Sequence, residues 1–138
     1  MSLFENAEIG QQLEPFSVTI DWNMYKKYNR LVHEINPLHF NESYAKQLGY
    51  KTIVVAGVFT ASFFLRPLLK WIKDPTAILN YEIRFHDPVY LGDPISHHTS
   101  IKKKYEKKGN YYIEFEAWVE NQEKKRVTTG TVTVVFNR

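Results

Sequence analysis

The segment from Ile53 to Ile72 constrains the fold more than any other part of this chain, because it is apolar on nearly every side. A helix at a protein surface shows a single apolar stripe, so a helix of this composition has to be covered all round. A helix wrapped by a curved sheet meets that requirement. Arg66 and Lys70 interrupt the apolar run, which therefore falls short of the roughly 18 residues that a membrane span needs. We expect one long central helix here, with a kink or a turn at Pro67.

The apolar period changes from helical to two after Pro75, which indicates strands. Alternating apolar and polar residues, separated by stretches of turn composition, predict strands at 77–86, 95–105, 111–119 and 126–136. Long strands in direct succession predict an antiparallel meander with one buried face. A long apolar helix followed by such a meander belongs to the α+β class.

Shorter elements are expected before the central helix. Aspartate and asparagine favour helix starts, whereas glycine favours helix ends. The expected elements are a strand at Phe16–Ile20, a helix capped by Asp21 that stops at the Asn36-Pro37 step, and a short helix that begins at Asn41 or Ser43 and ends at Gly49.

Length and composition restrict the class of protein. We expect 138 residues to form one domain, 1–138, and 43% hydrophobic residues argue against disorder. The net charge of +3 is spread along the chain, so we expect no nucleic-acid partner, although it mildly favours an anionic ligand. The absence of cysteine excludes disulfides, thiolate metal sites and a cysteine nucleophile. The N-terminus lacks the apolar core of a signal peptide, so we expect a cytoplasmic protein without a membrane partner.

Glu34 and His39 are the candidate catalytic residues, because they place a carboxylate and an imidazole on either side of an Asn-Pro step. Pro37 cannot continue a helix smoothly, and it pushes Asn36 towards an extended conformation. The local chain is therefore expected to form a rigid turn. Such a turn can direct both side chains at one water, as paired acid–base catalysis requires. The alternative is a solvated glutamate and a histidine without a chemical role, since most polar surface residues have none.

Four segments resemble, in the same order, motifs of the MaoC-like dehydratases, the family of (R)-specific enoyl-CoA hydratases. They are His33–His39, similar to Gly-Asp-x-Asn-Pro-Leu-His; Ala56–Ser62, similar to His-Gly-Met-x-x-Ala-Ser; Arg84–Asp93, similar to Arg-Phe-x-x-Pro-Val-x-x-Gly-Asp; and Thr129–Val132, which suits the last strand. Together they span most of the chain. The sequence departs from the family pattern at two positions: Glu34 replaces an aspartate, and Ala56 replaces a histidine.

The resemblance implies a hot-dog fold, in which an antiparallel sheet wraps a central helix, and a dimer in which two sheets join edge to edge. It also implies hydration of trans-2-enoyl thioesters, or the reverse dehydration of (R)-3-hydroxyacyl thioesters, carried on coenzyme A or acyl carrier protein. No metal or redox cofactor is implied, since coenzyme A is only part of the substrate. An exposed strand edge invites association, which favours a homodimer or a heterodimer with a second hot-dog subunit.

Residue by residue, the resemblance assigns the attacking water to Glu34 and His39. The N–H of Gly57 would stabilise the enolate oxygen, because the first N–H groups of a helix are unpaired and favour negative charge. Asn36 and Ser62 complete the candidate substrate-binding set. Two of these residues have alternatives. Asn36 can brace its own turn, which is the role we favour, and Gly57 can simply allow tight packing.

Two other groups of polar residues carry weaker hypotheses. His97 and His98 look like a metal pair, but adjacent strand residues point to opposite faces, so we expect no two-histidine metal site. The lysines at 102–104, 107 and 108 are expected to be solvated, and contact with coenzyme A phosphates is the alternative.

The residue at position 34 decides between two functions. A hydro-lyase is favoured, because Glu34 keeps the charge of the family aspartate. Its side chain is one methylene longer, so the backbone or His39 has to shift for the water to be held. The alternative is a non-catalytic acyl-binding or stabilising subunit of a hot-dog heterodimer, in which the longer side chain has disabled the site.

Overall fold

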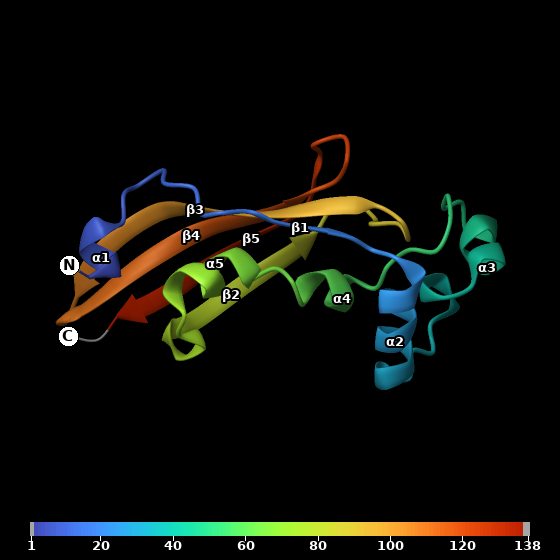
Figure 1. The fold of residues 1–138 in the computed structure, drawn as a ribbon, viewed down its shortest axis with the longest axis horizontal. Coiled ribbons are helices and arrows are strands. Elements are labelled where there is room, and N and C mark those ends of the chain that lie inside the picture. Colours follow the sequence, from blue (N-terminus) through green and yellow to red (C-terminus); the bar gives the residue numbers. More distant parts are fainter. Residues whose placement is uncertain (1, 137–138) are drawn as a thin grey trace.

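A five-stranded antiparallel sheet forms the body of the protein in the computed structural model, which describes residues 2–136 (Figure 1). The strands are β1 (Phe16–Thr19), β2 (Ile78–Phe85), β3 (Pro94–Lys107), β4 (Asn110–Glu120) and β5 (Arg126–Phe136). Their order across the sheet is β1-β3-β4-β5-β2. This sheet, together with several helices, confirms the predicted α+β class.

The helices are short and fall into two groups. They are α1 (Leu3–Asn6), α2 (Trp22–Val32), α3 (Glu42–Gln47), α4 (Gly57–Ala61) and α5 (Arg66–Ile72), with 3-10 turns η1 (Pro37–His39) and η2 (Pro75–Ala77). Figure 1 shows α4 and α5 along one face of the sheet, whereas α2 and α3 lie beyond one end of it. Within residues 2–136, no helix has the length and apolar character needed to cross a membrane.

The two helices beyond the sheet begin at the predicted residues. Asp21 caps α2 by accepting a hydrogen bond from the Met24 N–H at 2.8 Å, and Asn41 caps α3 through its side-chain oxygen. However, α2 ends at Val32 and does not continue to the Asn-Pro step. His33 adopts a left-handed conformation, with φ of 54°, which turns the chain out of the helix. The segment with the candidate catalytic residues therefore lies outside α2.

The helix predicted at 53–72 is wrong in its start and its length, because an extended segment comes first and α4 and α5 follow, but the interruption expected at Pro67 is confirmed. In that segment the Val55 N–H donates to the Val89 carbonyl oxygen at 2.8 Å, which joins it to the loop before β3. Pro67 explains the break between the helices. It has no N–H for the carbonyl four residues earlier, and its ring would clash there, so it is accommodated in the first turn of α5.

The predicted strand order is wrong in one respect. β3, β4 and β5 form a meander, but β2 lies beside β5 and not beside β3. The other edge of β3 is already occupied by β1, so β2 has to pair elsewhere. Gly130 of β5 permits that pairing. A Cβ at Gly130 would collide with the carbonyl oxygen of Glu82 in β2 and with the ring of Phe64.

Alternation along β3 places its two adjacent histidines on opposite faces, as predicted. His97 points towards the helices and is 1% exposed, whereas His98 stacks on Trp118 on the outer face. The rings of Phe16 and Phe63 flank His97, each with a centroid distance of 5.9 Å. Burial, together with the nearby His98, lowers the pKa of His97 to about 4. His97 is therefore neutral at pH 7.

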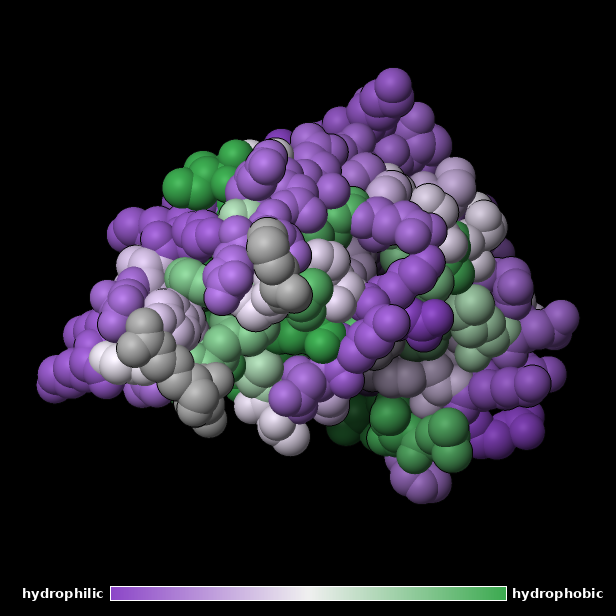
Figure 2. Space-filling view, turned by 60° about the vertical axis from the view of Figure 1, so that its left-hand side comes forward, coloured by the Kyte–Doolittle hydropathy of each residue, from purple (hydrophilic) through white to green (hydrophobic). Residues whose placement is uncertain are grey.

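The strand β2 forms one edge of the sheet and carries apolar side chains that the described chain leaves uncovered. Leu79, Tyr81 and Phe85 are each more than half exposed. Hydrophobic side chains (green) also reach the surface in patches between hydrophilic ones in Figure 2. An edge strand with exposed apolar side chains is a surface that another chain can cover.

Candidate active site

A cavity of about 370 Å³ lies between the turn that carries His39, the start of α4 and the end of β2. Among its lining residues are His39, Tyr50, Gly57, Thr60, Phe85, His86, Asp87 and Thr128. The cavity thus brings together two of the five candidate residues, His39 and Gly57. The other three, Glu34, Asn36 and Ser62, do not line it.

The His39 ring is held by a backbone oxygen. Its Nδ1 lies 2.8 Å from the carbonyl oxygen of Val54. Because a carbonyl oxygen can only accept a hydrogen bond, Nδ1 carries the proton, and in the neutral ring Nε2 keeps its lone pair. The Asn29 side chain also donates to the His39 carbonyl oxygen, at 3.4 Å. This arrangement fixes the ring and leaves Nε2 as a proton acceptor.

Glu34 lies just beyond α2, where it is half-buried. Its Oε1 accepts a hydrogen bond from the Asn36 N–H at 3.0 Å, and no hydrogen bond or ion pair joins it to His39 within residues 2–136. Burial raises the pKa of the Tyr28 hydroxyl, and the Glu34 charge raises it further, so the carboxylate lies near that face of α2. The two candidate side chains thus have different hydrogen-bond partners, the Asn36 N–H for Glu34 and the Val54 carbonyl for His39.

Asn36 braces this turn, in agreement with the structural alternative. Its side-chain oxygen accepts a hydrogen bond from the Leu38 N–H at 3.1 Å and thereby caps η1. The Asn36 side chain is exposed and lies outside the cavity lining. Pro37 follows in the first turn of η1, where its missing N–H costs nothing.

Gly57 is the first residue of α4, and its N–H has no acceptor among the described residues. A Cβ at this position would lie 3.1 Å from carbon atoms of the Phe85 ring. The residue before it, Ala56, occupies the place of the family histidine. Ala56 is buried, and its N–H donates to the Tyr25 hydroxyl at 3.0 Å. The geometry therefore allows both predicted roles of Gly57, an N–H donor and a site of tight packing.

Ser62 lies away from the cavity, because its hydroxyl donates to the Phe59 carbonyl oxygen and its side chain is exposed. Thr60 of α4 does line the cavity, as do the hydroxyl residues Tyr50 and Thr128, and it donates to the Gly57 carbonyl oxygen at 2.9 Å. The sequence analysis missed Thr60. A helical turn separates it from Gly57, so their spacing could have shown that they share one side of the helix.

Phe85 and His86 are further lining residues that the sequence analysis did not select. The Nε2 of His86 lies 2.7 Å from the Thr129 hydroxyl. Both residues belong to the segment Arg84–Asp93, which resembled a family motif. The motif could therefore have pointed to them, but only the path of β2 along β5 shows that this segment reaches the cavity.

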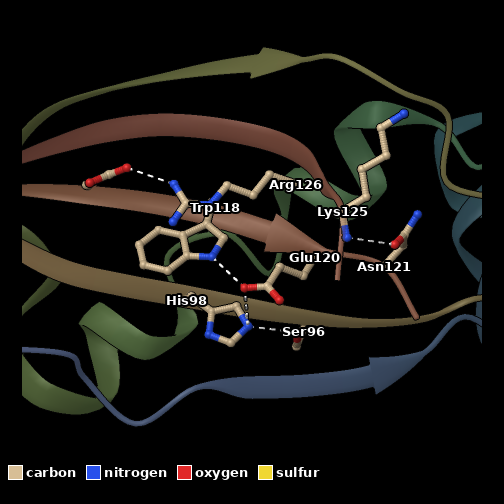
Figure 3. A network of polar contacts seen from close by, with 8 residues as sticks. Ser96, His98, Trp118, Glu120, Asn121, Lys125 and Arg126 are labelled. Carbon is tan, nitrogen blue, oxygen red and sulfur yellow. Dashed lines mark hydrogen bonds and ion pairs between the residues drawn. The ribbon is translucent and has the colours of Figure 1, made fainter. Parts of the chain in front are cut away.

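A second polar network lies on the outer face of the sheet (Figure 3). There Glu120 accepts a hydrogen bond from the Trp118 ring nitrogen at 2.8 Å, and the Arg126 guanidinium covers that ring. Ser96 and Glu120 both approach the Nε2 of His98, at 2.8 and 3.4 Å. A serine–histidine–carboxylate relay needs the carboxylate at the other ring nitrogen, so this network is not a nucleophile triad.

Three curated proteins show sequence similarity to this chain, among them the following two. A mitochondrial 3-hydroxyacyl-[acyl-carrier-protein] dehydratase from Solanum lycopersicum is 39% identical over 69 residues, which are 49% of this chain and 41% of that protein. An (R)-specific enoyl-CoA hydratase from Rhodospirillum rubrum is 30% identical over 94 residues, which are 67% of this chain and 65% of that protein. The chain therefore spans less than two thirds of either relative.

Solved structures show the fold. The (R)-hydratase from A. caviae superimposes with a TM-score of 0.82 at 21% identity, covering 97% of this chain and 99% of that one. A chain of the HadBC complex from Mycobacterium tuberculosis, a 3R-hydroxyacyl-ACP dehydratase, superimposes with a TM-score of 0.72 at 20% identity, covering 93% and 96%. These similarities confirm the predicted hot-dog fold.

A comparison with models of protein families, which uses the sequence alone, gives the family of this chain. The family model of the MaoC like domain matches residues 4–120. This range includes the turn with His39, the start of α4 and the end of β2, which together enclose the cavity. The chain belongs to the MaoC-like domain family.

Proposed function

We propose that this protein adds water to trans-2-enoyl thioesters and, in reverse, dehydrates (R)-3-hydroxyacyl thioesters. One observation carries the proposal: the oriented His39 ring and the unpartnered N–H of Gly57 meet at the same cavity. The first offers a base for water, and the second offers a donor for the thioester oxygen. The names of the two curated relatives support this chemistry. It requires neither a metal nor a redox cofactor.

His39 acts through Nε2 in this proposal. Because Val54 holds the ring proton on Nδ1, Nε2 accepts a proton from water. The water oxygen then bonds to C3 of the enoyl group, and the electron pair of the C2–C3 double bond moves towards the thioester oxygen. Return of the proton to C2 restores the thioester and completes the hydration. The water thus supplies the 3-hydroxyl and the new hydrogen on C2.

Gly57 stabilises the enolate oxygen that forms in this step. A preorganised N–H directed at a developing oxyanion is commonly the largest single contribution to such a reaction. The absence of a side chain at Gly57 leaves room for the thioester beside the Phe85 ring. The absence of a Cβ at Gly57 therefore matters both for packing against Phe85 and for substrate binding.

Glu34 positions the same water in this proposal. Its Oε1 is occupied by the Asn36 N–H, but the second carboxylate oxygen can still accept a hydrogen bond. Because Glu34 lies outside the cavity lining, its side chain, one methylene longer than the family aspartate, has to extend towards this water when the substrate binds. Glu34 is thus the residue at which the proposal is most easily tested.

We also propose that the working form is a homodimer joined along β2. The exposed apolar residues Leu79, Tyr81 and Phe85 lie on this edge strand, and Phe85 also lines the cavity. A second copy at this edge would bury these side chains and close the cavity on that side. Light scattering at micromolar concentration should give twice the chain mass, and a monomer would contradict this part of the proposal.

A non-catalytic subunit of a heterodimer is the second candidate. It is favoured by the position of Glu34 outside the cavity lining and by the HadBC complex among the similar structures. In that case the cavity would hold an acyl chain without turning it over, or would only support a partner subunit.

Hydration of crotonyl-CoA and of a longer enoyl-CoA, followed through the loss of the conjugated thioester absorbance, separates the two candidates. We expect the wild type and the outer-face control His98→Ala to be active, and His39→Ala to be inactive. An inactive wild type that gains activity on Glu34→Asp would favour the non-catalytic subunit. Equal rates for wild type and His39→Ala would reject the proposed site.

A further inference from the structure

We propose that the exposed side of α2 is a docking surface for an acidic carrier protein that delivers the thioester, an inference that rests on the function proposed above. This surface, which we call the α2 face, consists of Trp22, Lys26, Lys27, Arg30, Leu31 and Ile35. It combines positive charge with exposed apolar side chains, and it adjoins the turn that holds His39.

The charges on the α2 face are not neutralised by the chain itself. Lys26, Lys27 and Arg30 are exposed and lie within one turn of each other on the helix. None of them takes part in an ion pair within residues 2–136. The two acidic residues that adjoin the helix are engaged elsewhere: Asp21 caps its start, and Glu34 after its end accepts from the Asn36 N–H. The face therefore presents positive charge to a partner.

The apolar part of the face is unusually open. Leu31 and Ile35 are 80% and 88% exposed, more than any other large hydrophobic residue described in this structure. Trp22 is also exposed at the other end of the helix. Apolar anchors next to charged groups are the usual composition of a protein–protein interface, in which the charges steer the encounter.

The position of the face fits delivery of a thioester. Ile35 adjoins Glu34 in the sequence, and α2 lies at the same end of the sheet as the start of α4 (Figure 1). Coenzyme A offers phosphates for the cations but no folded apolar surface to cover Leu31 and Ile35. A second copy of this chain is placed along β2 by the homodimer proposed above, and there it would leave the three unpaired cations of the α2 face without a partner. An acidic protein satisfies both requirements.

The hairpin between β3 and β4 provides a matched control. Lys102, Lys103, Lys107 and Lys108 are exposed there and carry similar charge. Figure 1 shows this hairpin at the opposite end of the sheet from α2. Reversing the same number of charges on the hairpin changes the net charge equally but leaves the α2 face intact.

The experiment compares kcat/KM for crotonyl thioester on acyl carrier protein and on coenzyme A. The variants are K26E/K27E/R30E on the α2 face, L31S/I35S on its apolar part, and K102E/K103E/K107E on the hairpin. We expect both α2 variants to lower kcat/KM for the carrier-bound substrate about tenfold or more, mainly through KM, because steering charges raise association rates by that order. The kcat/KM of the α2 variants for the coenzyme A substrate should equal that of the wild type, and the hairpin variant should match the wild type on both substrates. Added salt should reduce the difference in kcat/KM between the wild type and K26E/K27E/R30E on the carrier-bound substrate.

The outcomes are distinguishable. Equal losses on both substrates, or no loss on either, would overturn the docking surface while the hydratase function stands. A change of oligomeric state in L31S/I35S, read by light scattering, would identify a second copy of the chain as the occupant and would also overturn it. A wild type inactive on both substrates would instead overturn the proposed function, and the docking surface with it.

Discussion

His39 and His97 lie in opposite surroundings. The first is on a turn at the surface of a cavity, and the second is inside the sheet. His39 lies at a cavity, with one ring nitrogen bound to the Val54 carbonyl and the other open. His97 is 1% exposed, and neither of its ring nitrogens has a partner within residues 2–136. Aromatic rings enclose it. The same side chain thus has one open ring nitrogen at a cavity in one place and is neutral and buried in the other.

The difference shows what a histidine needs for acid–base chemistry. One nitrogen has to be satisfied so that the tautomer is fixed, and the other has to reach the substrate. Burial alone gives a strongly lowered pKa but no access, as at His97. The strongly perturbed pKa therefore points away from the proposed active site, whereas the hydrogen bond to Val54 belongs to it.

Replacement of the two histidines should affect the hydration rate very differently. Loss of a positioned base typically lowers a rate about 10²–10⁴-fold. We expect His39→Ala to lose hydration activity by that order, with little change in thermal stability. His97→Leu should keep the wild-type hydration rate, since its ring neighbours Phe16 and Phe63 do not line the cavity. A measurement of kcat and melting temperature for both variants checks this, and a large rate loss in His97→Leu would contradict it.

Variants of Glu34 test whether its carboxylate and the His39 ring act on the same water. Glu34→Gln should lower the rate steeply, because it removes the charge that holds the water. The double variant Glu34→Gln/His39→Ala should be little worse than either single change, since residues that act as a unit are strongly non-additive. Glu34→Asp should keep measurable activity. Losses that multiply in the double variant would show that the two residues act independently.

The motif around His39 was readable from the sequence, because Pro37 and Asn36 restrict the local backbone whatever surrounds them. The opposite orientation of His97 and His98 was equally readable from strand alternation. The path of β2 was not, because it depends on which edge remains free and on the close approach that Gly130 allows. The break of the central helix was signalled by Pro67, but its start at Gly57 depends on pairing of the preceding segment with the loop before β3. The contact between Gly57 and Phe85 is tertiary and left no local signal.

The pH dependence of stability should report His97. Its pKa is about 4 in the folded protein against about 6.5 when unfolded, so the unfolded chain binds more protons between these values. Stability should therefore be fully present above pH 6.5 and fall as the pH decreases towards 4. The expected loss from this group is about 3 kcal/mol. Denaturant unfolding at several pH values, with His97→Leu as the control that lacks this dependence, provides the check.

Gly57 gives the smallest expected effect. A methyl group there would meet the Phe85 ring at 3.1 Å, but this ring is more than half exposed and can shift, so Gly57→Ala should cost at most about 1 kcal/mol of stability, the low end of the range for overpacking. Phe85→Leu should recover part of this loss, because a smaller side chain makes room. A double-mutant cycle by thermal unfolding measures the coupling. Strict additivity would mean that the two residues are not in contact.

The position of the proton on the His39 ring can be measured without any assay of activity. A ¹⁵N-edited NMR spectrum of the imidazole groups at neutral pH distinguishes a protonated from an unprotonated ring nitrogen, and His39→Ala assigns the signal. The account predicts that Nδ1 carries the proton and Nε2 does not, because the Val54 carbonyl can only accept. A His39 signal with the proton on Nε2 would contradict it, since the ring would then have no lone pair facing the water.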